Sequence, residues 1–113
     1  MLRISRVILF ANDLPRLATF YEEVLGLRLL ESDDPGWREY DAGGCRIALH
    51  KGGHMEKASR APKIVFQCED VASVREKLNA RGATFGKVKV AGALLLCDGK
   101  DPEGNALQLS NRP

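Results

Sequence analysis

The same residue pattern occurs twice in this chain of 113 residues. The segment 63–71, KIVFQCEDV, matches the segment 6–14, RVILFANDL, position by position: a basic residue, alternating apolar residues, then an aspartate before an aliphatic residue. The segment 101–110, DPEGNALQLS, matches 41–50, DAGGCRIALH, in the same way. An internal repeat of about sixty residues indicates two similar structural units, so any fold proposed for the chain has to contain both.

Each copy of the repeat begins with a predicted strand and a predicted helix. Apolar residues alternate over 6–11, which is typical of a half-buried strand. Asp13 and Asp70 each stand where a helix needs an N-cap, because a carboxylate can accept a hydrogen bond from a free backbone N–H. Gly26 and Gly82 supply the residue of positive φ that ends a helix. The sequence therefore predicts one capped helix in each copy.

Three further strands are predicted after each helix, at 27–32, 37–41 and 45–50, and at 83–90, 93–98 and 106–110. We therefore predict an α+β fold of two tandem βαβββ modules in a single domain: module 1 at about 1–50, a linker at 51–62 and module 2 at about 63–113. One helix and four strands make too small a core, so the modules should pair, within one chain or between two. A ferredoxin-like βαββαβ fold is the rival prediction, but it would place fewer strands between the helices.

The strand period of two assigns each side chain to one of two sheet faces. One face should pack against the helices; it carries Val7, Leu9, Ile47, Leu49, Ile64, Phe66, Leu107 and Leu109. The opposite face is too polar to be core, and we expect it to line a concave cup; it carries Arg6, Ile8, Phe10, Arg46, Ala48, His50, Lys63, Val65, Gln67, Ala106, Gln108 and Ser110. The face of Trp37 stays open, so this residue is either a wall of the cup or part of a dimer core.

Three motifs resemble a known family: DLPRLATFYEEVLGL at 13–27, EDVASVREKLNARGA at 69–83 and DPEGNALQL at 101–109. Together they resemble the vicinal oxygen chelate superfamily, which includes glyoxalase I, bleomycin-resistance proteins, fosfomycin-resistance enzymes and extradiol dioxygenases. The resemblance implies paired βαβββ modules whose mixed sheets curl into a ligand-holding cup, with the helices on the outer face. It also implies a homodimer, because members of this length are usually dimers.

The resemblance further implies a divalent metal bound by His or Glu from the first and last strands of each module. Those positions fall on Arg6, Ala48, Lys63 and Gln108. Arginine and lysine are cations at neutral pH and cannot bind a metal ion, and alanine has no donor atom. Among these positions and His50, which lies two residues after Ala48 on the same face, only His50 and Gln108 could offer a ligand atom, and a strong site needs three or four. We therefore predict neither a metal nor another cofactor.

Arg6 and Lys63 occupy equivalent positions in the two copies, so the repeat predicts that both reach the cup. Two cations in a partly dry cavity would bind an anion, and a guanidinium suits a carboxylate or a phosphate. The alternative is that both are ordinary surface charges at strand starts. No catalytic residue is assigned, although His50 is a candidate acid or base, and no pair of carboxylates is expected on this face. The predicted ligand-binding residues are Arg6, Phe10, Arg46, His50, Lys63, Gln67 and Gln108.

We therefore predict a metal-free protein that binds or sequesters a small anionic organic molecule. Bleomycin does not suit a basic cup, because the resemblance implies an acidic pocket for that cationic drug. One alternative is a metal-dependent lyase, isomerase or dioxygenase whose shifted ligands include His50. Another is a non-catalytic subunit whose sheet face binds a protein.

Composition excludes several other partners. With 17 basic and 15 acidic residues the net charge is +2, too small to indicate nucleic acid or an anionic membrane. No apolar run approaches the roughly 20 residues of a membrane span. The three cysteines, Cys45, Cys68 and Cys97, are dispersed, which favours reduced thiols and a cytoplasmic location.

Overall fold

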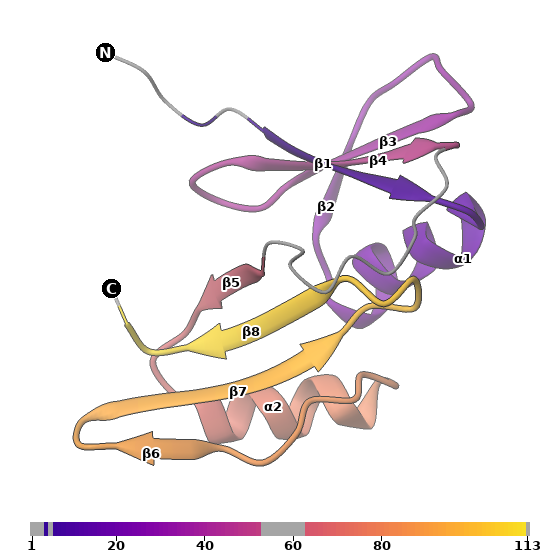
Figure 1. Ribbon diagram of the computed structural model, residues 1–113. Helices are drawn as coiled ribbons and strands as arrows, with labels where there is room; N and C mark the ends of the chain where they lie inside the picture. Colours follow the sequence, from indigo (N-terminus) through magenta and orange to yellow (C-terminus); the bar gives the residue numbers. More distant parts are fainter. Residues whose placement is uncertain (1–3, 5, 53–62, 113) are drawn as a thin grey trace. The chain divides into compact units, whose positions relative to one another are not determined.

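The computed structural model describes residues 4, 6–52 and 63–112 (Figure 1). The described chain forms two compact units, one on each side of residues 53–62. We call them module 1 and module 2, as in the sequence prediction, and describe each by itself. In the described residues, no helix is both long enough and apolar enough to cross a membrane.

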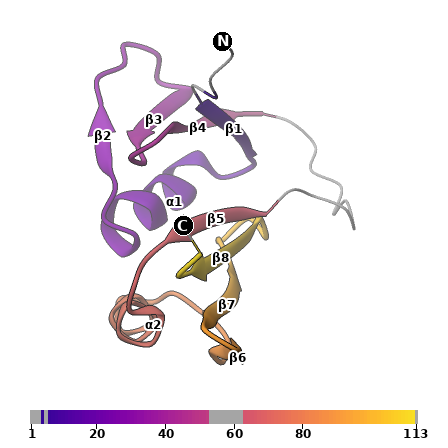
Figure 2. The ribbon, with the colours of Figure 1, turned by 90° about the vertical axis from the view of Figure 1, so that its left-hand side faces the viewer.

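Module 1 is a four-stranded mixed sheet with one helical segment. Its sheet has the order β1-β4-β3-β2, with β1 parallel to β4 and the other pairs antiparallel. The helix lies on one face of these strands (Figure 2). The elements are β1 (Arg6–Ala11), α1 (Leu14–Thr19), which continues as a π-helical segment (Phe20–Val24), β2 (Arg28–Leu30), β3 (Trp37–Asp41) and β4 (Arg46–Lys51).

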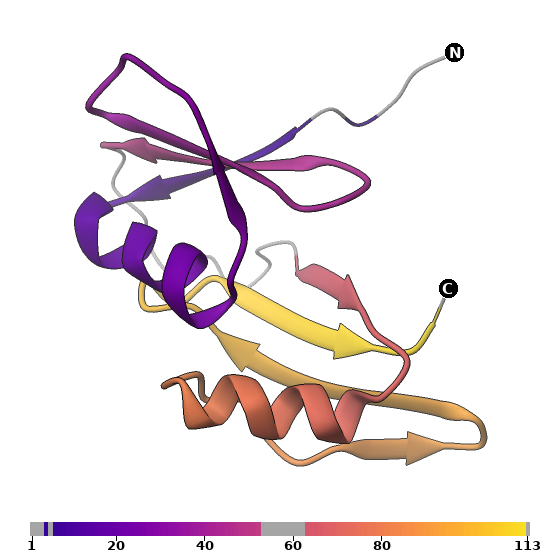
Figure 3. The same cartoon turned by 180° about the vertical axis from the view of Figure 1, so that it is seen from behind.

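Module 2 repeats this topology. Its sheet has the order β5-β8-β7-β6, with β5 parallel to β8 and the other pairs antiparallel. Its helix also covers one face of its sheet (Figure 3). The elements are β5 (Ile64–Gln67), α2 (Val71–Ala80), β6 (Lys89–Ala91), β7 (Leu94–Lys100) and β8 (Ala106–Ser110). The predicted α+β fold of two βαβββ modules is confirmed, whereas the curled sheet and its cup stay predictions, as does the grouping of both modules in a single domain.

The predicted helix ends are confirmed in both modules. The Asp13 carboxylate accepts a hydrogen bond from the Arg16 backbone N–H at 3.1 Å, and Asp70 accepts one from the Ser73 N–H at 3.0 Å. Gly26 has φ of 74° after the first helix, and Gly82 has φ of 108° after the second. The positive φ explains why glycine stands at these positions.

The strand predicted at 83–90 is mostly wrong. Only its end belongs to a strand, β6, because the preceding backbone is held by the helix instead. The Asn79 side chain donates to the carbonyl oxygen of Phe85 at 3.0 Å and accepts from the Phe85 N–H at 2.9 Å. The linker boundary also shifts, since β4 continues through Lys51. Residues 53–62 of the predicted linker lie outside the described part of the chain.

Burial agrees with the two predicted sheet faces for the large apolar side chains, although the small residues Ala48 and Ser110 of the predicted cup face are buried as well. Ile47 and Leu49 on β4, and Leu107 and Leu109 on β8, are buried on the helix side of their sheets. Their counterparts on the edge strands β1 and β5 are half-buried, because an edge strand has a neighbour on one side only. They are Val7, Leu9, Ile64 and Phe66. The helix-free face of each sheet is therefore available for function.

Candidate functional site

The helix-free face of module 1 carries three rows of side chains, set by the register of β1, β4 and β3. Each row contains one residue from each of the three strands, and successive rows are two residues apart along each strand. We call the first the aromatic row and the third the charged row. The rows are Phe10, His50 and Trp37; Ile8, Ala48 and Glu39; and Arg6, Arg46 and Asp41.

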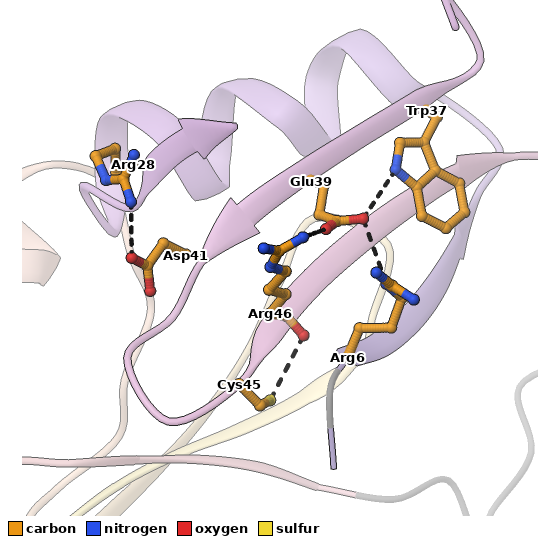
Figure 4. Close-up of polar contacts among 7 residues, drawn as sticks. All are labelled: Arg6, Arg28, Trp37, Glu39, Asp41, Cys45 and Arg46. Carbon is orange, nitrogen blue, oxygen red and sulfur yellow. Dashed lines mark hydrogen bonds and ion pairs between the residues drawn. The ribbon is translucent and has the colours of Figure 1, made fainter. Parts of the chain in front are cut away.

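Glu39 connects the charged and aromatic rows (Figure 4). Its Oε2 accepts a hydrogen bond from Arg46 Nη1 at 2.9 Å, and its Oε1 lies 3.4 Å from Arg6 Nε. The same Oε1 accepts a hydrogen bond from Trp37 Nε1 at 3.1 Å. Burial alone would raise the pKa of Glu39, which is 7% exposed, but the hydrogen bond from Arg46 and the charge of Arg6 hold that pKa below its ordinary value. Glu39 is therefore ionised at neutral pH and holds both arginines.

A hollow of about 570 Å³ lies beside this cluster, at the end of the sheet where β3 turns into β4. Its polar lining includes Arg6, Arg46, Arg28 and Asp41. Arg28 Nη2 lies 2.9 Å from Asp41 Oδ2, and hydrogen bonds from the Gly43 backbone and from Arg28 lower the pKa of Asp41. Three guanidinium groups thus face two carboxylates, which leaves this end of the sheet with a net positive charge.

The aromatic row is built around His50. The His50 ring centroid lies 5.8 Å from that of Phe10 and 5.5 Å from that of Trp37, both in edge-to-face geometry. His50 Nδ1 lies 2.7 Å from the carbonyl oxygen of Lys51. Because a carbonyl oxygen only accepts, Nδ1 is the donor in this contact, and in a neutral imidazole Nε2 is then the acceptor.

Module 2 has a second charged cluster on its own helix-free face. Asp98 Oδ1 lies 2.9 Å from Lys63 Nζ and accepts a hydrogen bond from Gln108 Nε2 at 2.9 Å. Its Oδ2 lies 3.5 Å from Lys89 Nζ. The hydrogen bonds from Gln108 and Lys63 lower the pKa of Asp98. Gln67 and Gln108 also line a hollow of about 360 Å³, together with Val65, Ser110 and Arg112.

The predicted binding residues thus fall into two groups, one in each module. Within module 1, Arg6 joins Arg46 through Glu39, and Phe10 contacts His50. Within module 2, Lys63, Gln67 and Gln108 share one face. Trp37 is now placed: it lies on the helix-free face, with its indole N–H on Glu39. The ligand-binding role of the seven residues stays a prediction.

The prediction that no pair of carboxylates would lie on this face was wrong. Glu39 and Asp41 both lie on the helix-free face of module 1. The alternation of side chains along 37–41 could have revealed this pair, because a buried Tyr40 places its neighbours Glu39 and Asp41 on the opposite face of β3. Asp98 and Lys89 were missed in module 2 because ion pairs across strands depend on the strand register, which the sequence pattern does not fix.

The residues present do not fit the divalent metal that the resemblance implies. Arg6 and Lys63 are each paired with a carboxylate, and Ala48 has no donor atom. Within 4, 6–52 and 63–112, no three His, Cys, Asp or Glu side chains are grouped so that they could hold a metal ion.

Solved structures share this fold. Lactoylglutathione lyase from Agrobacterium tumefaciens is 17% identical with a TM-score of 0.74, and the match covers 95% of this chain and 91% of that one. A glyoxalase/bleomycin resistance protein/dioxygenase family enzyme from Burkholderia phytofirmans PsJN is 20% identical with a TM-score of 0.78, covering 96% and 98%. TioX from Micromonospora sp. ML1 is 19% identical with a TM-score of 0.80, covering 97% and 98%.

A search of curated protein sequences finds no match. The family model of the glyoxalase/bleomycin resistance protein/dioxygenase superfamily, by contrast, matches residues 3–109. This match covers nearly the whole chain, and the repeated βαβββ topology agrees with it. The chain therefore belongs to the glyoxalase/bleomycin resistance protein/dioxygenase superfamily, the vicinal oxygen chelate superfamily.

Proposed function

We propose that this protein binds, and thereby sequesters, a small organic molecule with an acidic group, and that it does so without a metal. The observation that carries the proposal is the pair of arginines that Glu39 holds beside the hollow of module 1. Arg6 stands where the family resemblance implies a metal ligand, so a protein cation replaces the metal as the positive charge of the site.

The geometry of the arginines supports an anionic ligand. A guanidinium group carries five N–H donors in a fixed fork, and the ion pairs with Glu39 engage Nε of Arg6 and Nη1 of Arg46. The other nitrogens of both groups remain as donors for a carboxylate or phosphate. Because Glu39 fixes the two side chains before the ligand arrives, binding costs less side-chain entropy.

The rest of the proposal follows the family resemblance. In module 2, we propose that Lys63, Gln67 and Gln108 bind polar groups of a ligand on the face that they share, and that the protein acts as a homodimer in the cytoplasm. No catalytic residue is assigned. Since hydrogen bonds lower the pKa of both Asp41 and Asp98, neither carboxylate is suited to act as a general acid at neutral pH.

A metal-dependent lyase, isomerase or dioxygenase remains the second candidate, and one observation favours it. The His50 Nδ1–H bond to the carbonyl of Lys51 leaves Nε2 available, which is the arrangement of most metal-binding histidines. Glu39 lies on the same face. For Glu39 to serve as a second ligand, however, the metal would have to displace Arg6 and Arg46.

Calorimetric titration with small organic acids and their matched amides tests the proposal. We expect the acids to bind and the amides to bind at least about tenfold more weakly, the typical strength of one charged hydrogen bond. Arg46→Gln should reduce affinity for the acids by a similar factor. Arg38→Gln is the matched control, because Arg38 lies on the same strand but on its other face. Equal binding of acids by wild type and Arg46→Gln would contradict the proposal.

A further inference from the structure

The aromatic row is an exposed aromatic surface. Phe10 is 43% exposed, and Ile8, beside it on β1, is also 43% exposed. An apolar patch at the surface of a folded domain commonly marks a place where something binds. Phe10, His50 and Trp37 come from three adjacent strands, β1, β4 and β3, so the sheet backbone fixes their spacing.

Glu39, in the row between them, brings the aromatic row and the arginines together. Arg6 Nε and Trp37 Nε1 contact the same oxygen of Glu39, at 3.4 and 3.1 Å, so these two nitrogens lie no more than about 6.5 Å apart. Glu39 therefore orients the indole ring and the guanidinium group together (Figure 4). A ligand that places an acidic group on the arginines can therefore extend its next atoms toward the Trp37 end of the aromatic row.

His50 adds a directional polar contact to this surface. Its Nδ1 is bound to the backbone, and its ring is held edge-on between Phe10 and Trp37. The neutral ring can use Nε2 to accept a hydrogen bond from an O–H or N–H group of a ligand. The row thus offers apolar ring contacts and one acceptor, which suit a planar ring that carries a donor.

We propose that the ligand of module 1 is an aromatic or heteroaromatic acid, with its ring on Phe10, His50 and Trp37 and its acidic group on Arg6 and Arg46. This inference rests on the proposed function, because the acidic group is taken from it. It adds the chemical class of the rest of the ligand. Aromatic side chains bind rings in offset or edge-to-face contact, which a saturated ring cannot reproduce.

Three matched probes test the ring and the acidic group separately: benzoate, cyclohexanecarboxylate and benzamide. The first pair differs in aromaticity, and benzamide keeps the aromatic ring but loses the charge. Trp37 is the only tryptophan of the chain, so its emission reports on the aromatic row alone. Calorimetry gives the affinity of each probe. We expect benzoate to change the Trp37 emission and to bind about three- to tenfold more tightly than cyclohexanecarboxylate, as one aromatic contact would give.

The outcomes separate this inference from the proposed function. If both carboxylates bind equally and benzamide does not bind, the ring inference is overturned while the acid proposal stands. If benzoate and benzamide bind equally, the acid proposal fails; loss of both in Phe10→Leu would still place the ring on the row. No binding by any probe at millimolar concentration would overturn both.

Two variants locate the ring. Phe10→Leu keeps an apolar side chain of similar size and should remove the preference for benzoate over cyclohexanecarboxylate. Leu29→Ala is the control, because Leu29 is an exposed apolar residue of the same module on the opposite face of the sheet. An unchanged preference in Phe10→Leu would place the ring elsewhere and contradict the inference.

Discussion

Glu39 and Asp98 occupy corresponding places in the two modules. Glu39 pairs with Ala48 in the register of β3 and β4, and Asp98 pairs with Gln108 in the register of β7 and β8. Each carboxylate binds a basic residue at the beginning of its module, Arg6 at the start of β1 or Lys63 just before β5. The two modules therefore share an ion pair at equivalent positions in addition to the same backbone topology.

The low pKa of Glu39 predicts acid sensitivity. A carboxylate whose pKa is lower in the folded than in the unfolded protein stabilises the fold above its unfolded pKa, and this contribution is lost as pH falls. We expect the free energy of unfolding to decrease below the ordinary glutamate value of 4.5, as measured by urea denaturation over a pH series. Glu39→Gln should flatten this part of the curve. An identical pH dependence in wild type and variant would contradict the assignment.

The sequence predicted some of these residues and missed others for a physical reason. The repeat and the period of two placed Arg6 and Lys63 on the correct faces, because both depend on local spacing. The partners of these cations could not be found in that way, since an ion pair across strands depends on the register of β3 and β7. Arg6 and Lys63 each lie in a cluster in which a carboxylate neutralises part of the positive charge.

At the scale of elements, the sequence predicted most accurately those features that depend on residues close together in the chain. The caps Asp13 and Asp70 and the stops Gly26 and Gly82 act within a few residues of themselves, and all four are confirmed. The strand predicted at 83–90 failed because a contact from α2 decides that segment. The Asn79 side chain satisfies both backbone groups of Phe85, so this part of the backbone does not need a sheet partner.

Gly99 on β7 offers a sharp test of packing in module 2. A Cβ atom at this position would lie 2.8 Å from Cδ1 of Phe85, a buried side chain that has little room to move. We expect Gly99→Ala to lower the free energy of unfolding by about 1–3 kcal/mol, the usual cost of overpacking a core. Chemical denaturation measures this directly.

Gly44 supplies the matched control for this substitution. No atom lies within 4 Å of a Cβ built there, and its φ is not in the positive range. Gly44→Ala should therefore change stability by no more than about 0.5 kcal/mol. If Gly99→Ala were as mild as Gly44→Ala, the close packing of Phe85 against β7 would be wrong.

At the scale of the whole molecule, the repeat alone predicted two βαβββ modules, and the family match agrees with it. How the modules pair could not be predicted, because a module can complete its core with the other module of its chain or with one from a second chain. The position of the ligand relative to both modules depends on the same choice.

The proposed homodimer has a direct test. Light scattering coupled to size exclusion should give a mass of twice the 12.4 kDa of one chain, as the resemblance to a family whose members of this length are usually dimers implies. A mass of one chain over a tenfold range of protein concentration would contradict the dimer. It would also require the two modules to pair within one chain.

The central claim is that basic side chains of this protein replace the metal of its family. The most direct test is elemental analysis after incubation with nickel, zinc, manganese and ferrous iron, followed by desalting. We predict no stoichiometric metal, because Arg6 and Lys63 are cations and Ala48 has no donor atom. One metal ion per chain would contradict the account; it would point to a site that includes His50 and to an enzyme.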